Sequence, residues 1–257
     1  MATYLDRILE RHRALAAEET RSLDELLEQA REMEPTRGFR AAITASDSLA
    51  VISEIKRRSP SKGDLNPDLD PARMAQTYEA GGATCLSVLT DREFFGGSPA
   101  DLQAARAACS LPVLRKDFTV SPFDVVDARL MGADCVLLIA AAVRTCLLAD
   151  LHALALDLGL DVLVEVHDEA GLEAAIRAEA GMIGVNQRDL FTFEVDHARA
   201  ARMAKLIPDG AVKVAESGVR GPDDARALRQ AGYHAILVGE TLVTAADPRN
   251  TVTELRQ

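Results

Sequence analysis

The sequence contains no tryptophan, and aromatic residues make up only 4% of its 257 residues, although 48% are hydrophobic. A core of that size must therefore be built mainly from leucine, valine, isoleucine and alanine. The length allows two small domains or one barrel, because single (β/α)8 barrels of about 250 residues are common.

Basic residues are also scarce: 29 Lys and Arg stand against 40 Asp and Glu, and the net charge is −11. An acidic chain is a poor partner for nucleic acid or an anionic membrane, so we expect neither. The basic residues are nonetheless concentrated locally, which suits an anionic small molecule. They are Lys56, Arg57, Arg58 and Lys62, followed by Arg115 and Lys116.

None of the four cysteines has CxxC spacing, which argues against a redox or zinc motif. Cys85 and Cys135 lie inside apolar runs, as buried free thiols do in a reducing compartment. The first residues lack the apolar segment of a signal peptide, and no run approaches membrane-spanning length. We therefore expect a cytoplasmic protein.

The first 48 residues predict helices. Apolar residues recur at helical spacing over 3–17, and a second amphipathic stretch follows Ser22 until Pro35 interrupts it. Their apolar faces need a surface, so residues 1–48 are expected to form an N-terminal helical extension packed on the body. His12 lies within the first apolar stripe, and we interpret it as a packing residue rather than a ligand.

Eight apolar, β-branched runs then alternate with helical patterns, at the roughly 20–35-residue spacing of βα units. The runs cover 49–55, 84–89, 111–116, 134–139, 161–166, 181–186, 211–215 and 235–239. Because they are continuous, both faces of each strand should be buried, as in a parallel sheet covered by helices. Residues 1–257 are thus predicted to form a single α/β domain, a (β/α)8 (TIM) barrel with an extra N-terminal helical segment. A doubly wound sheet is the alternative, but its Gly-rich dinucleotide fingerprint is absent.

Polar residues gather where the predicted strands end, which is where barrels of this kind carry their active groups. Buried polar side chains are costly unless paired, so their presence at nearly every strand end indicates a site. They include Glu54, Lys56, Thr90, Asp91, Arg115, Lys116, Asp117, Glu165, Asn186, Arg188, Glu216, Ser217, Glu240 and Thr241.

Glu54 and Lys56 should lie on one face of the first strand, where they can hold and protonate a polar ligand. The alternative is a surface ion pair, which contributes little stability. The last two strand ends, Ser217–Gly218 and Gly239–Thr241, suit a phosphate, since glycine permits close approach of backbone N–H groups. Two ordinary βα turns would also use glycine, but Lys56 neighbours the last strand in a closed barrel and favours the phosphate.

Several of these segments form specific motifs, notably Glu54-Ile55-Lys56-Arg57-Arg58-Ser59-Pro60-Ser61, Arg115-Lys116-Asp117-Phe118 and Glu216-Ser217-Gly218. With them the chain resembles the indole-3-glycerol phosphate synthase family over its whole length. The resemblance implies closure of the indole ring in tryptophan biosynthesis, a carboxy-lyase reaction. The substrate would be 1-(2-carboxyphenylamino)-1-deoxyribulose 5-phosphate, which loses CO2 and water without a metal or organic cofactor. Gln187 departs from the Asn that the family commonly has there.

The reaction implied by the resemblance gives the strand-end residues roles. Lys116 would be the general acid that protonates the ketone, and Lys56 would neutralise substrate charge and assist proton transfer. Glu54 and Glu165 are the acid and base of the dehydration, in an order that the sequence leaves open.

The remaining candidates would bind the substrate. Asn186, Glu216 and Ser217 would orient its hydroxyl groups, and Arg188 would hold its carboxylate. The apolar wall for the aromatic ring would consist of Phe95, Phe118, Leu137 and Leu190. Further substrate contacts are expected from Ser59, Gly218, Leu237, Gly239 and Glu240.

Two rival functions are a phosphoribosylanthranilate isomerase and a non-catalytic phosphate-binding barrel. The isomerase should have a Cys–Asp pair, yet no Cys lies at a strand's carboxyl end. The joint presence of Glu54, Lys56, Lys116 and Glu165 argues against lost catalysis.

We further expect a monomer that associates at most weakly with other tryptophan-pathway enzymes. The first helix should cover the mouth of the barrel as a lid, with Tyr4, Arg7 and Arg11 facing an anionic ligand. A stabilising clasp elsewhere on the barrel is the alternative.

Overall fold

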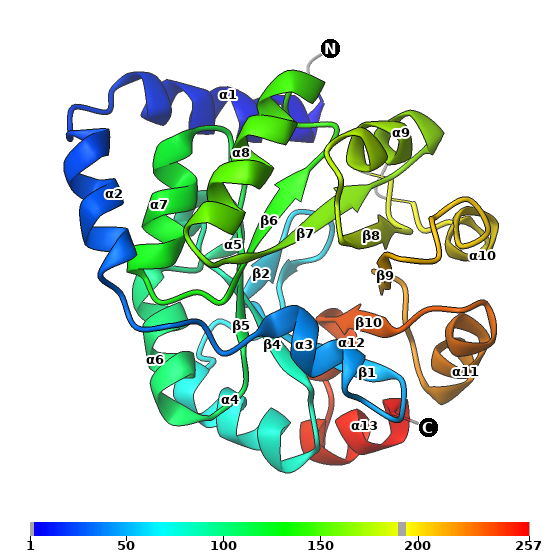
Figure 1. Ribbon diagram of the computed structural model, residues 1–257. Coiled ribbons are helices and arrows are strands. Elements are labelled where there is room, and N and C mark those ends of the chain that lie inside the picture. The colour runs from blue at the N-terminus through cyan, green and yellow to red at the C-terminus, as the bar shows by residue number, and fades with distance from the viewer. Residues whose placement is uncertain (1–2, 190–193, 257) are drawn as a thin grey trace.

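The computed structural model, which describes residues 3–189 and 194–256, is a closed barrel of eight parallel strands surrounded by helices (Figure 1). Around the barrel the strands follow the order β1-β10-β9-β8-β7-β6-β5-β4. They are β1 (Ala50–Ile55), β4 (Cys85–Leu89), β5 (Val113–Lys116), β6 (Cys135–Ile139), β7 (Asp161–Val166), β8 (Met182–Asn186), β9 (Val212–Glu216) and β10 (Ala235–Val238). The predicted (β/α)8 barrel is confirmed, and each strand overlaps one of the eight apolar runs.

Helices follow the strands, and several of them begin at an N-cap residue followed by proline. Asp70, Ser98 and Ser121 each accept a hydrogen bond from a backbone N–H of the first turn, and proline at the first helical position needs no partner for its nitrogen. The helices are α4 (Pro71–Ala80), α6 (Pro99–Ala108), α7 (Pro122–Leu130), α8 (Thr145–Asp157), α9 (Glu169–Arg177), α10 (Arg199–Met203), α11 (Pro222–Gln230) and α13 (Pro248–Leu255). Short elements at the strand ends are a hairpin of β2 (Arg58–Ser59) and β3 (Gly63–Asp64), and the helices α5 (Arg92–Phe95) and α12 (Glu240–Val243).

The strand sequences are continuously apolar because successive side chains point to opposite sides of the barrel wall. On β6, Val136 and Leu138 belong to the layer between sheet and helices, whereas Cys135, Leu137 and Ile139 belong to the barrel interior. Both faces are therefore removed from water, as expected for a parallel sheet.

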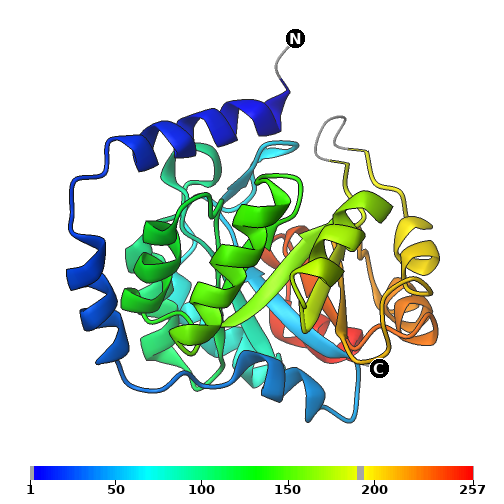
Figure 2. The same ribbon diagram turned by 45° about the horizontal axis from the view of Figure 1, so that its top comes forward.

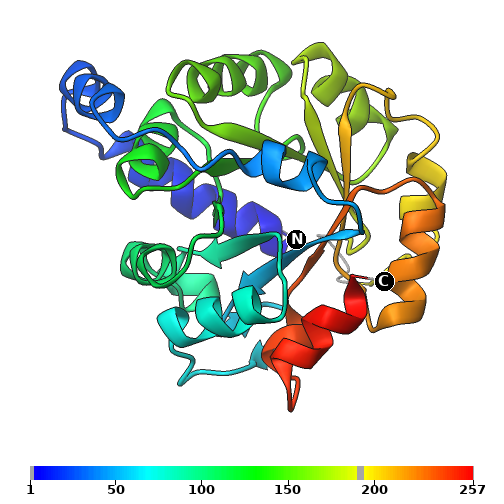
Figure 3. The same ribbon diagram turned by 60° about the horizontal axis from the view of Figure 1, so that its bottom comes forward.

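The N-terminal extension forms three helices, α1 (Tyr4–Ala17), α2 (Leu23–Arg31) and α3 (Phe39–Thr44). Helix α1 lies across the carboxyl ends of the strands, α2 runs beside α7, and α3 crosses the opposite end of the barrel (Figures 2 and 3). Leu9 of α1 and Phe39 of α3 belong to the same interior cluster as the inward-facing strand residues. The extension therefore closes both ends of the barrel interior.

The cysteines and helix lengths agree with the sequence-based expectations. All four cysteines are free thiols, and Cys85 and Cys135 are buried in the barrel, where burial raises the pKa of each thiol well above its usual range. Within the described residues, no helix is both long and apolar enough to cross a membrane.

Candidate active site

A cavity of about 350 Å3 opens at the carboxyl ends of the strands, beneath α1. All seven predicted catalytic residues line it: Glu54, Lys56, Lys116, Glu165, Asn186, Glu216 and Ser217. Eight of the ten predicted substrate contacts line it too: Ser59, Phe95, Phe118, Arg188, Gly218, Leu237, Gly239 and Glu240. Residues far apart in the sequence therefore share one wall because the parallel strands all end at this face.

The other two predicted contacts differ. Leu190 lies outside the described residues. Leu137, contrary to expectation, is not among the residues that line the cavity and is only 1% exposed. Ile139, two residues further along the same face of β6, lines the cavity instead. The strand was interpreted correctly, but Leu137 lies one layer deeper in the barrel.

The carboxylate of Glu54 accepts a hydrogen bond from the ammonium of Lys56, as the two-residue spacing on β1 predicts. This pair lies close to Gly239, the residue that follows β10. A Cβ on Gly239 would lie 2.2 Å from Glu54 Oε1 and 3.0 Å from Lys56 Nζ. Glycine at position 239 is therefore required for the pair to occupy its place.

Lys116, at the end of β5, reaches across the barrel to Glu165 on β7. Its Nζ lies 3.6 Å from Glu165 Oε2. Burial favours the neutral amine, but the carboxyl groups of Glu165, Glu216 and Glu54 outweigh it and raise the pKa of Lys116 above its usual range. Lys116 is therefore a partly buried cation that can donate a hydrogen bond or a proton.

The pKa values of Glu165 and Glu216 are shifted in opposite directions. Burial raises the pKa of both, but for Glu165 the neighbouring Lys116 ammonium outweighs it, and the net pKa is lowered. For Glu216, burial and the charge of Glu165 together hold the pKa well above its usual range. Two buried carboxyl groups beside one another cannot both ionise at low cost, so we assign the charge to Glu165 and the proton to Glu216.

The end of β9 turns sharply into the cavity. Ser217 and Gly218 have φ values of +67° and +74°, the left-handed region that is costly for a residue with a side chain. The carbonyl of Ser217 accepts a hydrogen bond from Gln187 Nε2 at 2.8 Å. Gln187 thus supports the strained turn. At Gly218 a Cβ would lie 2.5 Å from Val195 Cγ1, so a larger residue would not fit.

Two cations at this side of the cavity are joined through Glu240. Its carboxylate oxygens lie 3.6 Å from Lys62 Nζ and 3.6 Å from Arg188 Nη2. The Arg188 backbone N–H also donates to Asn186 Oδ1 at 2.9 Å. Glu240 therefore contributes by positioning cations, and not by direct attraction of an anion.

The basic residues that are concentrated in the sequence do not all face the cavity. Lys56, Lys62 and Lys116 line it. Arg57 instead pairs with Asp101, and the guanidinium of Arg58 donates to the carbonyl of Glu93 at 2.7 Å. These two arginines fix the loop that follows β1, so only part of this group of basic residues lines the cavity.

Helix α1 covers the mouth as expected, and Tyr4, Leu5 and Ile8 line the cavity. Arg7 and Arg11 do not reach it. Both are exposed, with Arg7 stacked over the Tyr4 ring at 5.8 Å and Arg11 Nε 3.3 Å from Glu93 Oε2. Of the three residues expected to face the ligand, only Tyr4 lines the cavity.

Comparison with known proteins decides the family. A family model of indole-3-glycerol phosphate synthase matches residues 5–255. The chain belongs to the indole-3-glycerol phosphate synthase family. Indole-3-glycerol phosphate synthase of Bordetella pertussis (strain Tohama I) is 49% identical over 235 residues, which cover 90% of each chain. The chain is therefore a carboxy-lyase of tryptophan biosynthesis that acts on a small phosphorylated substrate, and the isomerase and the non-catalytic barrel are set aside.

Solved structures of more distant proteins share the fold alone. Thiamine phosphate pyrophosphorylase from Pyrococcus furiosus superposes with a TM-score of 0.61 at 18% identity, over 81% of this chain and 94% of that one. A cube-shaped, highly porous cage designed by fusing symmetric oligomeric domains gives a TM-score of 0.56 at 15% identity, over 80% and 70%.

The synthase site also includes residues that the sequence analysis did not single out. His167 Nε2 lies 3.4 Å from Glu165 Oε1, and burial lowers the pKa of this imidazole, so it is neutral at pH 7. The signal was available, because His167 follows Glu165 by the same two residues that place Lys56 beside Glu54. Arg220 lines the cavity as well, beyond the end of β9.

Proposed function

We propose that the indole ring is closed in the cavity beneath α1, with Lys116 as the general acid. The observation that carries this proposal is the contact between Lys116 and Glu165, 3.6 Å apart on two different strands. A partly buried ammonium beside a buried carboxylate keeps its proton until a stronger base forms nearby, such as the oxyanion that develops at the substrate ketone.

In the first step the ring carbon that bears the carboxylate attacks the ketone carbon, and a carbon–carbon bond forms. The ketone oxygen takes a proton from Lys116 and becomes a hydroxyl group. The bond to the carboxylate then breaks, CO2 leaves, and the electron pair restores the aromatic ring. None of these events requires a metal or organic cofactor.

Dehydration follows in the same cavity. Glu165 is the ionised carboxylate, so we assign it as the base that takes the proton from the carbon next to nitrogen. The Lys56–Glu54 pair lies on the other side and supplies the proton for the departing hydroxyl. Glu216 is protonated and donates a hydrogen bond to one substrate hydroxyl group. Asn186 and Ser217 orient the other hydroxyl groups of the substrate.

The substrate's two ends differ in chemistry, and so do the two sides of the cavity. The phosphate would lie between the turn at Ser217–Gly218 and Gly239, within reach of Lys56. The aromatic ring would lie against Phe95 and Phe118, whose ring centroids are 6.2 Å apart, with Ile139 and Leu237 completing the wall. Arg188 would hold the anthranilate carboxylate until it leaves as CO2.

Helix α1 would act as a lid during this reaction. It contributes Tyr4, Leu5 and Ile8 to the cavity, so a bound substrate would be shielded from water on that side. Exclusion of water strengthens the electrostatic interactions within the site.

We also propose a cytoplasmic, monomeric enzyme that associates at most weakly with other tryptophan-pathway enzymes. The free cysteines are consistent with a reducing compartment.

The experiment that tests the proposed function is direct. Purified protein is mixed with 1-(2-carboxyphenylamino)-1-deoxyribulose 5-phosphate, and indole fluorescence is followed with time. Steady growth of the fluorescence supports the proposal, and no growth with folded protein contradicts it.

A further inference from the structure

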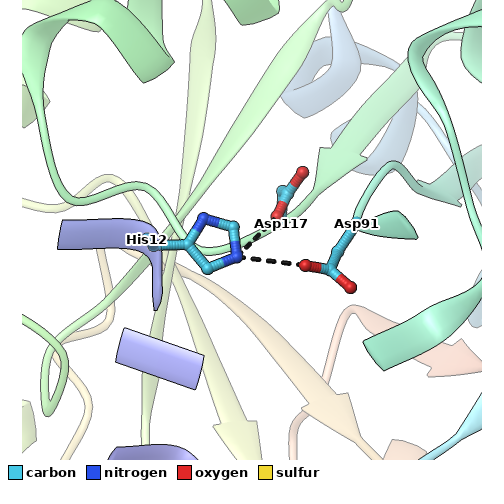
Figure 4. A group of neighbouring side chains, drawn as sticks. All are labelled: His12, Asp91 and Asp117. Carbon is cyan, nitrogen blue, oxygen red and sulfur yellow. Dashed lines mark hydrogen bonds and ion pairs between the residues drawn. The ribbon is translucent and has the colours of Figure 1, made fainter. Parts of the chain in front are cut away.

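The buried side of α1 carries one polar residue, His12, and its imidazole faces two carboxylates at the strand ends (Figure 4). Nε2 lies 3.1 Å from Asp91 Oδ2 and 3.7 Å from Asp117 Oδ1. The three side chains are 10%, 6% and 5% exposed. The sequence-based interpretation of His12 as a packing residue is therefore incomplete, because the residue also forms a buried polar contact.

Each carboxylate supports a different part of the aromatic wall of the cavity. Asp91 accepts the backbone N–H groups of Phe94 at 2.6 Å and Phe95 at 3.2 Å, and so begins the short helix α5 that presents Phe95. Asp117 follows Lys116 directly in the chain, and its Oδ1 accepts the backbone N–H of Phe118 at 2.8 Å.

His12 also touches the wall itself. Its ring lies 5.5 Å from the ring of Phe118, centroid to centroid, and Phe118 in turn packs against Phe95. The imidazole thus packs near Phe118 and joins the mouth-covering helix to the ends of β4 and β5.

The spacing of this cluster would suit a metal ion, since one donor atom from each residue lies within 4.8 Å of the others. The carboxylate oxygens are already engaged, however. One carboxylate oxygen of Asp91 accepts a backbone hydrogen bond at the start of α5, and the other is hydrogen-bonded to His12. Asp117 Oδ2 accepts hydrogen bonds from Thr90 Oγ1 and, at 3.1 Å, from Arg115 Nη2. A guanidinium so close disfavours a bound cation, so the cluster is a hydrogen-bonded junction.

We propose that His12 is a positioning residue for the synthase reaction, holding Asp91 and Asp117 so that Phe95 and Phe118 receive the aromatic ring of the substrate. The inference rests on the proposed place of that ring against the two phenylalanines. It concerns substrate fit, so loss of the junction should act mainly on KM.

The charges around His12 predict how the junction depends on pH. Asp91 faces it from the start of α5, Asp117 from the end of β5 and Asp124 from α7, while Arg115 is the cation that pairs with Asp117. Burial lowers the pKa of His12, but the three carboxylates together outweigh burial and raise it above 6.5. The imidazolium therefore contributes fully below about pH 6.5, and its contribution is lost as the pH rises through the raised pKa.

The test compares His12→Leu, which keeps an apolar side chain without a donor, with His12→Lys, which restores a cation. The matched control is His152→Leu, which removes another buried histidine from α8 on the outside of the barrel. We expect KM to rise about tenfold or more in His12→Leu, measured well below its melting temperature, because small misplacements of binding groups are costly. His12→Lys should recover most of the loss, and the control should match the wild type.

In the wild type KM should also rise with pH through the pKa of His12, and in His12→Lys this rise should disappear. The wild-type profile needs no altered fold, so it tests the inference even if His12→Leu is unstable. A KM in His12→Leu equal to that of the control, or a pH profile unchanged in His12→Lys, overturns the role of His12. An inactive wild type would instead overturn the proposed function.

Discussion

The carboxyl group of Glu216 occupies space that a side chain at Gly184 would need on the neighbouring strand. A Cβ on Gly184 would lie 2.0 Å from Glu216 Oε1. Gly184 is in register with Glu165 on β7, and Glu216 with Asn186 on β8, so this one position borders both carboxyl groups of the site. A glycine inside a strand lowers the stability of the strand, but the absence of a side chain at Gly184 makes room for the carboxyl group of Glu216.

Gly184→Ala should therefore impair catalysis. The added methyl group would push the Glu216 carboxyl out of place, and displacements of about 1 Å can cost on the order of 100-fold in rate. We expect kcat to fall by about that factor. Gly210→Ala is the control, because a Cβ there meets nothing within 4 Å. Equal kcat values for both variants would show that the Glu216 position does not matter.

The assignment of one proton to Glu216 and one charge to Glu165 predicts an unequal response to amides. Glutamine resembles a protonated glutamic acid, so Glu216→Gln should retain much more activity than Glu165→Gln. Loss of a general base typically costs 10²- to 10⁴-fold, which is the fall in kcat expected for Glu165→Gln. Steady-state kinetics of the two variants at pH 7 provide the measurement. The reverse order would exchange the roles of the two residues.

Anion binding tests the phosphate end of the cavity. Crystals soaked in phosphate or sulfate should hold the anion between Ser217–Gly218 and Gly239, close to Lys56. The backbone at the end of β9 turns toward this space, and glycine at both places allows a close approach. An anion found instead at the opposite face of the barrel, with this position empty, would contradict the assignment.

Deletion of the segment before Pro35 distinguishes a lid from a clasp. Three apolar residues of α1 are buried, Leu5, Ile8 and Leu9, and each contributes about 1.5–3 kcal/mol, so the melting temperature must fall. A lid also predicts a higher KM or lower kcat at temperatures where the truncated barrel is folded.

The control for that deletion is Leu27→Ala, which weakens the packing of α2 without touching the mouth. If the truncated protein has a lower melting temperature but wild-type kinetics well below it, the extension is a clasp.

Features of the fold and site that depend on local sequence pattern could be predicted from the sequence. Continuous apolar runs located the eight strands, and the polar residues that end them, such as Glu54 and Glu165, reached the cavity because all strand ends share one face. How deep in the barrel each inward-facing residue lies was harder to predict from the sequence. Leu137 and Ile139 point the same way, and only the stagger between strands decides which of them meets the ligand.

Contacts between distant segments could not be predicted from pattern at all. His12 and Asp91 are 79 positions apart, and nothing local indicates that they share a hydrogen bond. Similarly, Arg57 is adjacent to Lys56 in sequence, yet its partner Asp101 lies 44 positions away and turns it from the cavity. The number of basic residues close together in the sequence is therefore larger than the number that line the cavity.

The kcat of Lys116→Ala tests whether Lys116 is the general acid of ring closure. Without its proton donor the carbonyl is not protonated during attack, so kcat should fall about 10²- to 10⁴-fold. KM should change little, because a group that acts in the transition state contributes little to ground-state binding. Lys205→Ala, which removes an exposed lysine near α10, is the matched control and should behave as the wild type. A kcat for Lys116→Ala equal to that of this control would remove Lys116 from the mechanism.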